Sequence, residues 1–114
     1  MFDRVQAQEV MRKLMENRSG LTTSKIRKLL SMVNDIYNDV SMADAWDSKM
    51  QSKMDYFIIR MAYESGRDRD VNNFIKQAEL MEKAEKVKGK QQFMDFNKYL
   101  EALTAYHRFY GGRD

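Results

Sequence analysis

The chain has 114 residues, a net charge of only +3 with 32% charged residues, and neither cysteine nor proline. This length suits one domain with a single modest core, and the lack of cysteine excludes disulfides, thiolate catalysis and cysteine-rich zinc sites. No apolar run is long enough to span a bilayer and the opening MFDRVQAQEV lacks the apolar core of a signal peptide, so we expect a cytoplasmic protein. The absence of proline and the abundance of Lys, Glu, Gln, Met and Leu favour an all-α fold.

The first two predicted helices are separated by a short Ser-Gly turn. The first runs from about Phe2 to Asn17 and is followed by Gly20, a residue suited to the left-handed conformation found after many helices. The second starts after Thr22, whose hydroxyl can cap it, and keeps apolar residues at helical spacing as far as Val40.

Three further helices are predicted in the rest of the chain. The third follows a weakly patterned stretch in which Asp44 or Asp47 is the candidate cap, and it ends at Gly66. The fourth is capped by Asp68 and keeps its apolar pattern as far as Met81. A lysine-rich loop then leads to the fifth, which starts near residue 91 and ends at a Gly-Gly pair.

The fold that we expect is a compact single-domain bundle of five helices over residues 1–114. The chain has no internal repeat, low-complexity tract or long linker, so function must reside on helix surfaces and turns.

The third predicted helix carries a stripe of cations and phenol rings on one face, because residues three and four apart lie one above the other. Such a face suits a polyanion with stackable bases. Alternatively, the rings and lysine stems flank a buried apolar stripe. The stripe consists of Lys49, Lys53, Tyr56, Arg60, Tyr63 and Arg67.

The start of the second helix has cations where the helix dipole favours acids. Lys25, Arg27 and Lys28 crowd its first turns. Free backbone donors, threonine hydroxyls and cations at a helix N-terminus together suit a phosphate group. The alternative is a set of surface lysines screened by salt. Arg27 also begins a polar flank that continues through Ser31, Asn34 and Asn38, which suits phosphate and sugar oxygens or simply water.

The chain offers little for catalysis, and we predict no catalytic residues, metal site or cofactor. His107 is the only histidine, and its spacing places it on or beside an apolar face, where a structural role is the common one. Asp68 and Asp70 are joined by no further acid cluster, and capping explains Asp68.

Three stretches together identify a family: LTTSKIRKLLSMVNDIYN, RMAYESGRD and YLEALTAYHRFYGG. In this order they resemble the small helical subunit of the type III-A CRISPR effector, the Csm ribonucleoprotein. The resemblance covers nearly the whole chain.

The resemblance implies a non-catalytic RNA-binding and assembly subunit in antiviral defence. Several copies would form the inner filament of the complex beside other Csm-type subunits. They would contact target RNA paired with the crRNA, without sequence specificity, since guide pairing supplies the specificity. Tyr56 and Tyr63 are then interpreted as packing groups. The candidate RNA-binding residues are Lys25, Arg27, Lys28, Lys53, Arg60, Arg67 and Arg108.

Two alternatives remain open from the sequence. One is a purely structural scaffold whose cations pair with acidic surfaces of neighbouring subunits and which makes no direct RNA contact. The other is an enzyme such as a metal-dependent nuclease, which cleavage of RNA in the presence of a divalent metal would reveal.

Overall fold

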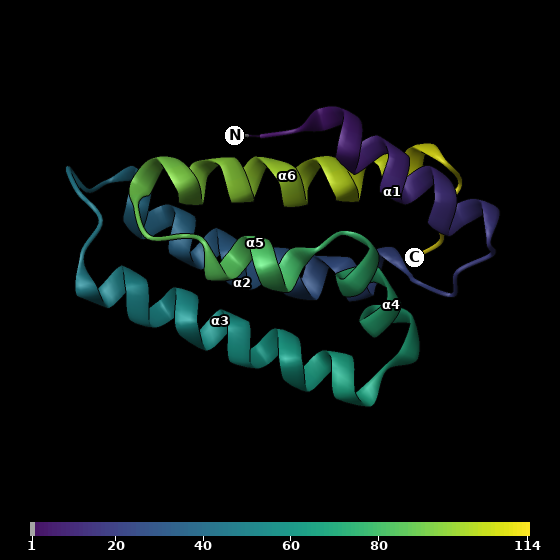
Figure 1. Ribbon diagram of the computed structural model, residues 1–114, viewed down its shortest axis with the longest axis horizontal. Helices are drawn as coiled ribbons and strands as arrows, with labels where there is room; N and C mark the ends of the chain where they lie inside the picture. The colour runs from purple at the N-terminus through teal and green to yellow at the C-terminus, as the bar shows by residue number, and fades with distance from the viewer. Residues whose placement is uncertain (1) are drawn as a thin grey trace.

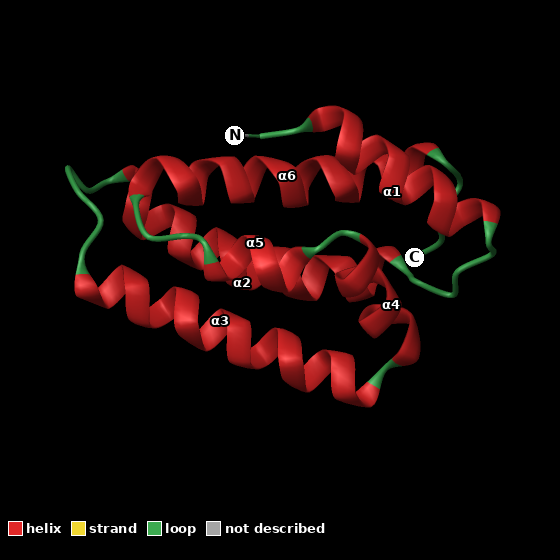
Figure 2. Cartoon of the chain, viewed as in Figure 1, coloured by secondary structure: helices red, strands yellow, loops and turns green. Residues whose placement is uncertain are grey.

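The computed structural model describes residues 2–114 of the chain. Within this range the chain folds into helices joined by loops and turns, and no strand occurs there (Figure 2). The predicted all-α bundle is confirmed. The helices are α1 (Arg4–Glu16), α2 (Thr23–Ser41), α3 (Ser48–Arg67), α4 (Arg69–Gln77), α5 (Leu80–Glu85) and α6 (Lys90–Phe109).

Helix α6 holds the bundle together, because both α1 and α2 pack against it (Figure 1). Helix α3 lies on the other side of α2 and is itself contacted by α4 and α5. The result is an elongated body of 42 × 28 × 22 Å, with α2 between α6 and α3. Its core residues include Ile26 of α2, Phe57 of α3 and Leu100 of α6, each at most 1% exposed.

Side-chain caps define where the long helices begin. Thr22 Oγ1 accepts the N–H three residues later at 3.3 Å, and Asp68 Oδ1 accepts the N–H two residues later at 2.9 Å, so both predicted caps are confirmed. At the start of α3 the cap is Asp47 and not Asp44, because Asp47 Oδ1 accepts the Met50 N–H at 2.8 Å. Each cap satisfies a backbone donor that the first helical turn leaves free.

The fourth predicted helix is in fact two. Glu79 adopts a left-handed conformation with φ of 56° and separates α4 from α5. Ala78 closes the buried face of α4, and the turn at Glu79 allows Leu80 to enter the core, where it is fully buried. The predicted helix count therefore holds for the longer helices, and the six-residue α5 is additional.

Two glycines play other roles than predicted. The left-handed residue after α1 is Arg18, with φ of 57°, and not Gly20. Gly20 instead lies close to Asp70, because a Cβ there would be 2.6 Å from Asp70 Oδ2 and would displace that carboxylate. Gly66 lies inside α3, which continues to Arg67.

His107 has the structural role that its spacing predicted. It is fully buried, with Nε2 2.8 Å from the Leu21 carbonyl oxygen and Nδ1 3.3 Å from Thr23 Oγ1. Gly112 packs directly on the ring, where a Cβ would overlap the imidazole. The last residues of the chain thereby lie beside the start of α2 (Figure 1).

No helix within residues 2–114 combines the length and apolar character needed to cross a membrane.

Candidate nucleic-acid interface

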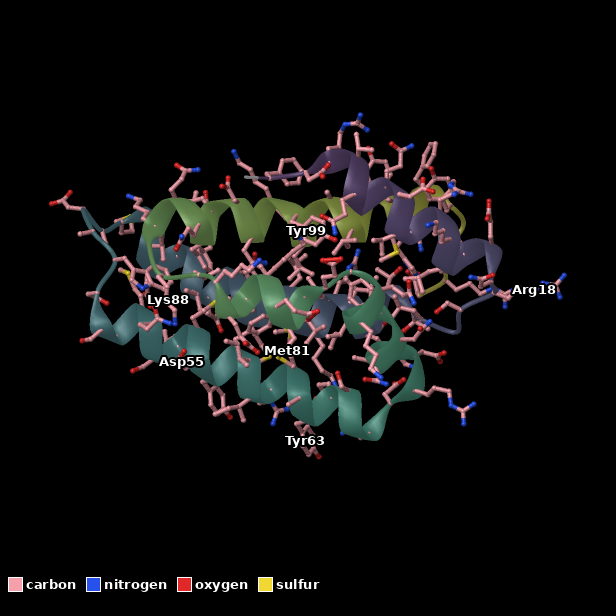
Figure 3. The ribbon with its side chains drawn as sticks, in the orientation of Figure 1. Arg18, Asp55, Tyr63, Met81, Lys88 and Tyr99 are labelled. Atoms are coloured by element: carbon pink, nitrogen blue, oxygen red, sulfur yellow. The ribbon has the colours of Figure 1, made fainter. Side chains whose placement is uncertain are left out.

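The stripe on α3 faces solvent through both of its tyrosines. Tyr56 is 58% exposed and Tyr63 is 54% exposed, so neither ring packs into the core. Figure 3 shows Tyr63 pointing outward from α3, away from the body of the bundle. The two rings were predicted to be packing groups, and the structure shows that they do not pack into the core. Tyr63 instead contacts other side chains of the stripe.

Tyr63 lies between two guanidinium groups of its own helix. The Arg60 Cζ is 4.9 Å and the Arg67 Cζ 5.8 Å from the centre of the ring. The spacing of three and four residues brings all three side chains together, and the ring attracts both cations through its quadrupole. The ring therefore supports the arginines on an exposed face.

Glu64 joins these arginines to α2. Its side chain is 7% exposed, with Arg60 Nη2 3.2 Å from Oε2 and Arg67 Nε 3.4 Å from Oε1. Lys28 Nζ of α2 lies 3.8 Å from the same Oε1. A buried carboxylate is costly unless it is paired, so Glu64 holds three candidate cations around one point.

Lys25 is paired with acids at the junction of α3 and α4. Its Nζ lies 2.9 Å from Asp68 Oδ2 and 3.7 Å from Asp70 Oδ2. The hydrogen bond with Lys25 lowers the pKa of Asp68 from its ordinary value, and the same bond raises the pKa of Lys25. The acids that the start of α2 lacks in sequence are thus supplied by another part of the fold.

The predicted phosphate site at the start of α2 is filled by the chain itself. The Thr23 N–H donates to the Arg113 carbonyl at 2.7 Å, and Thr22 caps the donor of Lys25. Ser24 Oγ also donates to the Asp114 carbonyl at 3.3 Å. Because these groups already accept and donate locally, the helix terminus is not an open anion site.

Arg27 remains available to an outside anion. It is exposed and has no ion-pair or hydrogen-bond partner among residues 2–114. Ser31, Asn34 and Asn38 are exposed along the same helix, so the predicted polar flank does face solvent.

The structure brings together four of the seven predicted RNA-binding residues. We call Lys25, Lys28, Arg60 and Arg67 the α2–α3 cation cluster. Three of them, together with Glu64 and Asp68, line a small hollow of about 220 Å³ between the two helices. Arg60 joins the same group through Glu64.

Lys53 and Arg108 lie apart from this cluster. Lys53, near the start of α3, pairs with Asp39, near the end of α2. The Lys53 ammonium lowers the pKa of the Asp39 carboxyl. Arg108 Nη1 lies 2.8 Å from Asp114 Oδ1, near the end of the chain. Both cations are thus engaged locally.

Glu64 and Asp70 are acidic partners of the α2–α3 cation cluster that the sequence reasoning missed. Glu64 follows Arg60 by four residues and precedes Arg67 by three, which is the spacing of intrahelical ion pairs, so the signal was present. The contact of Asp70 with Lys25 joins residues far apart in sequence and had no local signal.

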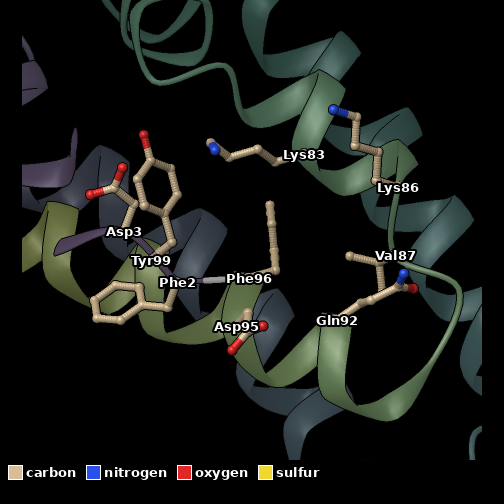
Figure 4. A pocket seen from close by; sticks show the side chains of 9 residues that line it. All are labelled: Phe2, Asp3, Lys83, Lys86, Val87, Gln92, Asp95, Phe96 and Tyr99. Carbon is tan, nitrogen blue, oxygen red and sulfur yellow. The ribbon is translucent and has the colours of Figure 1, made fainter. Parts of the chain in front are cut away.

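A second hollow, of about 300 Å³, lies between α5, α6 and the residues before α1 (Figure 4). None of the predicted RNA-binding residues lines it. Lys83 Nζ points toward the Tyr99 ring, 4.8 Å from its centre. Tyr99 donates a hydrogen bond to the Ala78 carbonyl at 2.9 Å, and burial raises the pKa of its phenol.

Comparison with known proteins places this chain in a family. Residues 3–113 match the family model described as Csm2 Type III-A. The "CRISPR system Cms protein Csm2" of Streptococcus thermophilus is 37% identical over 94 residues, which cover 82% of this chain and 76% of that protein. The protein of the same name from Enterococcus italicus is 38% identical over 97 residues, covering 81% and 69%. That from Mycobacterium tuberculosis is 30% identical over 117 residues, covering 98% and 94%.

The resemblance that the three sequence stretches indicated is thereby confirmed. The family match spans nearly the whole chain, including both helices of the α2–α3 cation cluster. This chain therefore belongs to the Csm2 family and is a small subunit of the type III-A Csm CRISPR effector complex.

Proposed function

We propose that this subunit binds RNA without sequence specificity while helping to assemble the Csm complex. The observation that carries the proposal is the α2–α3 cation cluster, in which two helices direct lysines and arginines to one end of the molecule. Cations at such positions neutralise phosphates, which every nucleic acid presents at regular spacing. Guide pairing then supplies the sequence specificity.

The charge balance of the cluster favours weak contacts that add up over several subunits. Its four cations face three carboxylates, those of Glu64, Asp68 and Asp70, which leaves one excess positive charge. Arg27 adds a further charge on the adjoining surface of α2. A single copy would therefore bind weakly, and several copies along a filament would bind the target RNA paired with crRNA more tightly.

Within this proposal the predicted residues contribute unequally. Arg27, Arg60 and Arg67 are the principal phosphate contacts, because guanidinium groups present several donors in a fixed plane. Lys25 and Lys28 support them. Lys53 and Arg108, which pair elsewhere on the surface, contribute only to the long-range field.

We further propose that the subunit has no catalytic activity of its own and acts in the cytoplasm. The histidine that would serve best as a general acid or base, His107, is fully buried with both ring nitrogens in polar contact. Cleavage of RNA by the purified chain, abolished by a substitution at His107 or Asp70, would contradict the proposal.

The test of RNA binding compares two double variants of the full chain. R60A/R67A removes two cations of the cluster, whereas K76A/K98A removes two exposed lysines on α4 and α6. Fluorescence anisotropy with unrelated single-stranded RNAs measures affinity as salt is varied. R60A/R67A should weaken binding about equally for every sequence. The slope of the logarithm of the binding constant against the logarithm of the salt concentration should fall in magnitude by about 1.4, or roughly 0.7 per lost contact with a single strand. An unchanged affinity and slope would remove these arginines from the site.

The scaffold alternative is favoured by a different surface. Tyr56 and Ile59 are exposed on α3, and an apolar groove between α2 and α3 is lined by Met32, Ile36 and Phe57. Exposed aromatic and methionine side chains are typical of protein interfaces. Under this alternative R60A/R67A would leave RNA binding unchanged and instead lower the yield of assembled complex.

A further inference from the structure

Glu64 occupies the centre of the α2–α3 cation cluster, although it would repel the phosphates that the cluster is proposed to bind. We propose that Glu64 is a positioning residue, which fixes the guanidinium groups of Arg60 and Arg67 in the geometry that receives RNA phosphates. This inference rests on the proposed function and names the residue that makes its site rigid.

The contacts of Glu64 leave most arginine donors free. The closest approach of Arg60 to Oε2 is through Nη2, at 3.2 Å, and that of Arg67 to Oε1 is through Nε, at 3.4 Å. A guanidinium carries five N–H donors. These contacts, together with a hydrogen bond between Arg67 and Tyr63, occupy only part of each guanidinium and leave further N–H donors for an anion.

The exposures place the acid beneath its partners. The Glu64 side chain is 7% exposed, whereas those of Arg60 and Arg67 are 35% and 55% exposed. A polyanion that approaches this face meets the cations before it meets the carboxylate. The buried carboxylate also loses much if its partners leave, so it holds them in place more firmly than an exposed acid would.

Tyr63 supports the same two side chains from another direction. Its ring lies 4.9 Å from the Cζ of Arg60 and 5.8 Å from that of Arg67. Each guanidinium is thus contacted by a carboxylate and by a ring of the same helix. The two arginines lose little further freedom when a phosphate binds.

Preorganisation outweighs repulsion in this arrangement. Ordering a flexible side chain on binding costs about two- to tenfold in affinity, and Glu64 removes much of this cost for two arginines at once. Its negative charge is shared among three cations, and the cluster remains positive. Loss of Glu64 should therefore weaken RNA binding even though it raises the net charge.

The experiment compares E64Q and E64D with E85Q in the full chain. E64Q keeps the size of the side chain and removes its charge, whereas E64D keeps the charge and shortens the reach to the arginines. E85Q removes an exposed acid of α5 and so controls for net charge alone. Anisotropy with a single-stranded RNA gives the affinity, thermal unfolding reports folding, and the NMR signal of the Arg67 Nε–H reports positioning.

We expect E64Q and E64D each to weaken RNA binding about fivefold and to shift the Arg67 Nε–H signal, while E85Q binds at least as tightly as the parent. Tighter binding by E64Q with unchanged binding by E64D would overturn the inference, because Glu64 would then act only as an opposing charge. Unfolding of both variants would also overturn it, by assigning Glu64 to the stability of the bundle. Failure of R60A/R67A to weaken binding would contradict the proposed function itself, so the two failures are distinguishable.

Discussion

The Lys25 Nζ lies 2.9 Å from Asp68 Oδ2, and this ion pair joins the start of α2 to the junction between α3 and α4. Asp68 has a second task, since its Oδ1 accepts the backbone N–H of Asp70 and of Val71 at the start of α4. One carboxylate thus caps a helix and anchors a cation of the proposed RNA-binding surface.

The two tasks of Asp68 are separable by substitution. D68N keeps an N-cap oxygen and loses the charge, whereas D68A loses both. We expect D68A to lower the free energy of unfolding by about 1 to 2 kcal/mol. D68N should cost less, about 0 to 1 kcal/mol, because only a partly exposed ion pair is lost. Urea denaturation of the three chains measures both differences, and an equal loss in D68N and D68A would show that the cap contributes nothing.

The lowered pKa of Asp68 predicts how the chain responds to acid. Because the folded-state pKa lies below the ordinary value of 3.8, the charged carboxylate stabilises the fold above that value. This stabilisation should disappear as the pH falls below about 4 and the native carboxylate takes up a proton. The difference in urea midpoint between the parent chain and D68N should therefore shrink from pH 7 to pH 3. A difference that is constant over this range would contradict the assignment.

Gly112 and Gly66 form a matched pair for testing close packing. A side chain at position 112 would overlap the buried ring of His107, so G112A should lower the free energy of unfolding by about 1 to 3 kcal/mol. Position 66 lies inside α3, and no atom would lie within 4 Å of a Cβ added there. G66A should therefore raise the free energy of unfolding by about 0.5 to 1 kcal/mol, because alanine loses less backbone entropy than glycine on folding. Thermal unfolding compares the two, and a harmless G112A would show that the end of the chain does not pack on α6.

Local patterns were enough to predict most of the fold. The apolar spacing of α2, the caps Thr22 and Asp68 and the burial of His107 were each predicted from residues close together in sequence, and the structure confirms them. The turn at Glu79 was not predicted, because the residues on each side of it keep an apolar pattern.

The candidate site was less predictable because its decisive contacts are between distant segments. The sequence shows a surplus of cations at the start of α2, but not that Asp68 supplies the missing charge or that Arg113 fills the helix terminus. Glu64 is the exception, since its spacing from Arg60 and Arg67 is local.

Photocrosslinking of a thiouridine-substituted target RNA in the reconstituted Csm complex tests the central claim most directly. Mass spectrometry would identify which peptides of this subunit carry RNA. We predict RNA on peptides that contain Arg27, Arg60 or Arg67, and none on the peptide around the exposed Lys98 of α6. Crosslinks from the arginine peptides to neighbouring subunits alone, with no RNA attached, would contradict RNA binding by this surface.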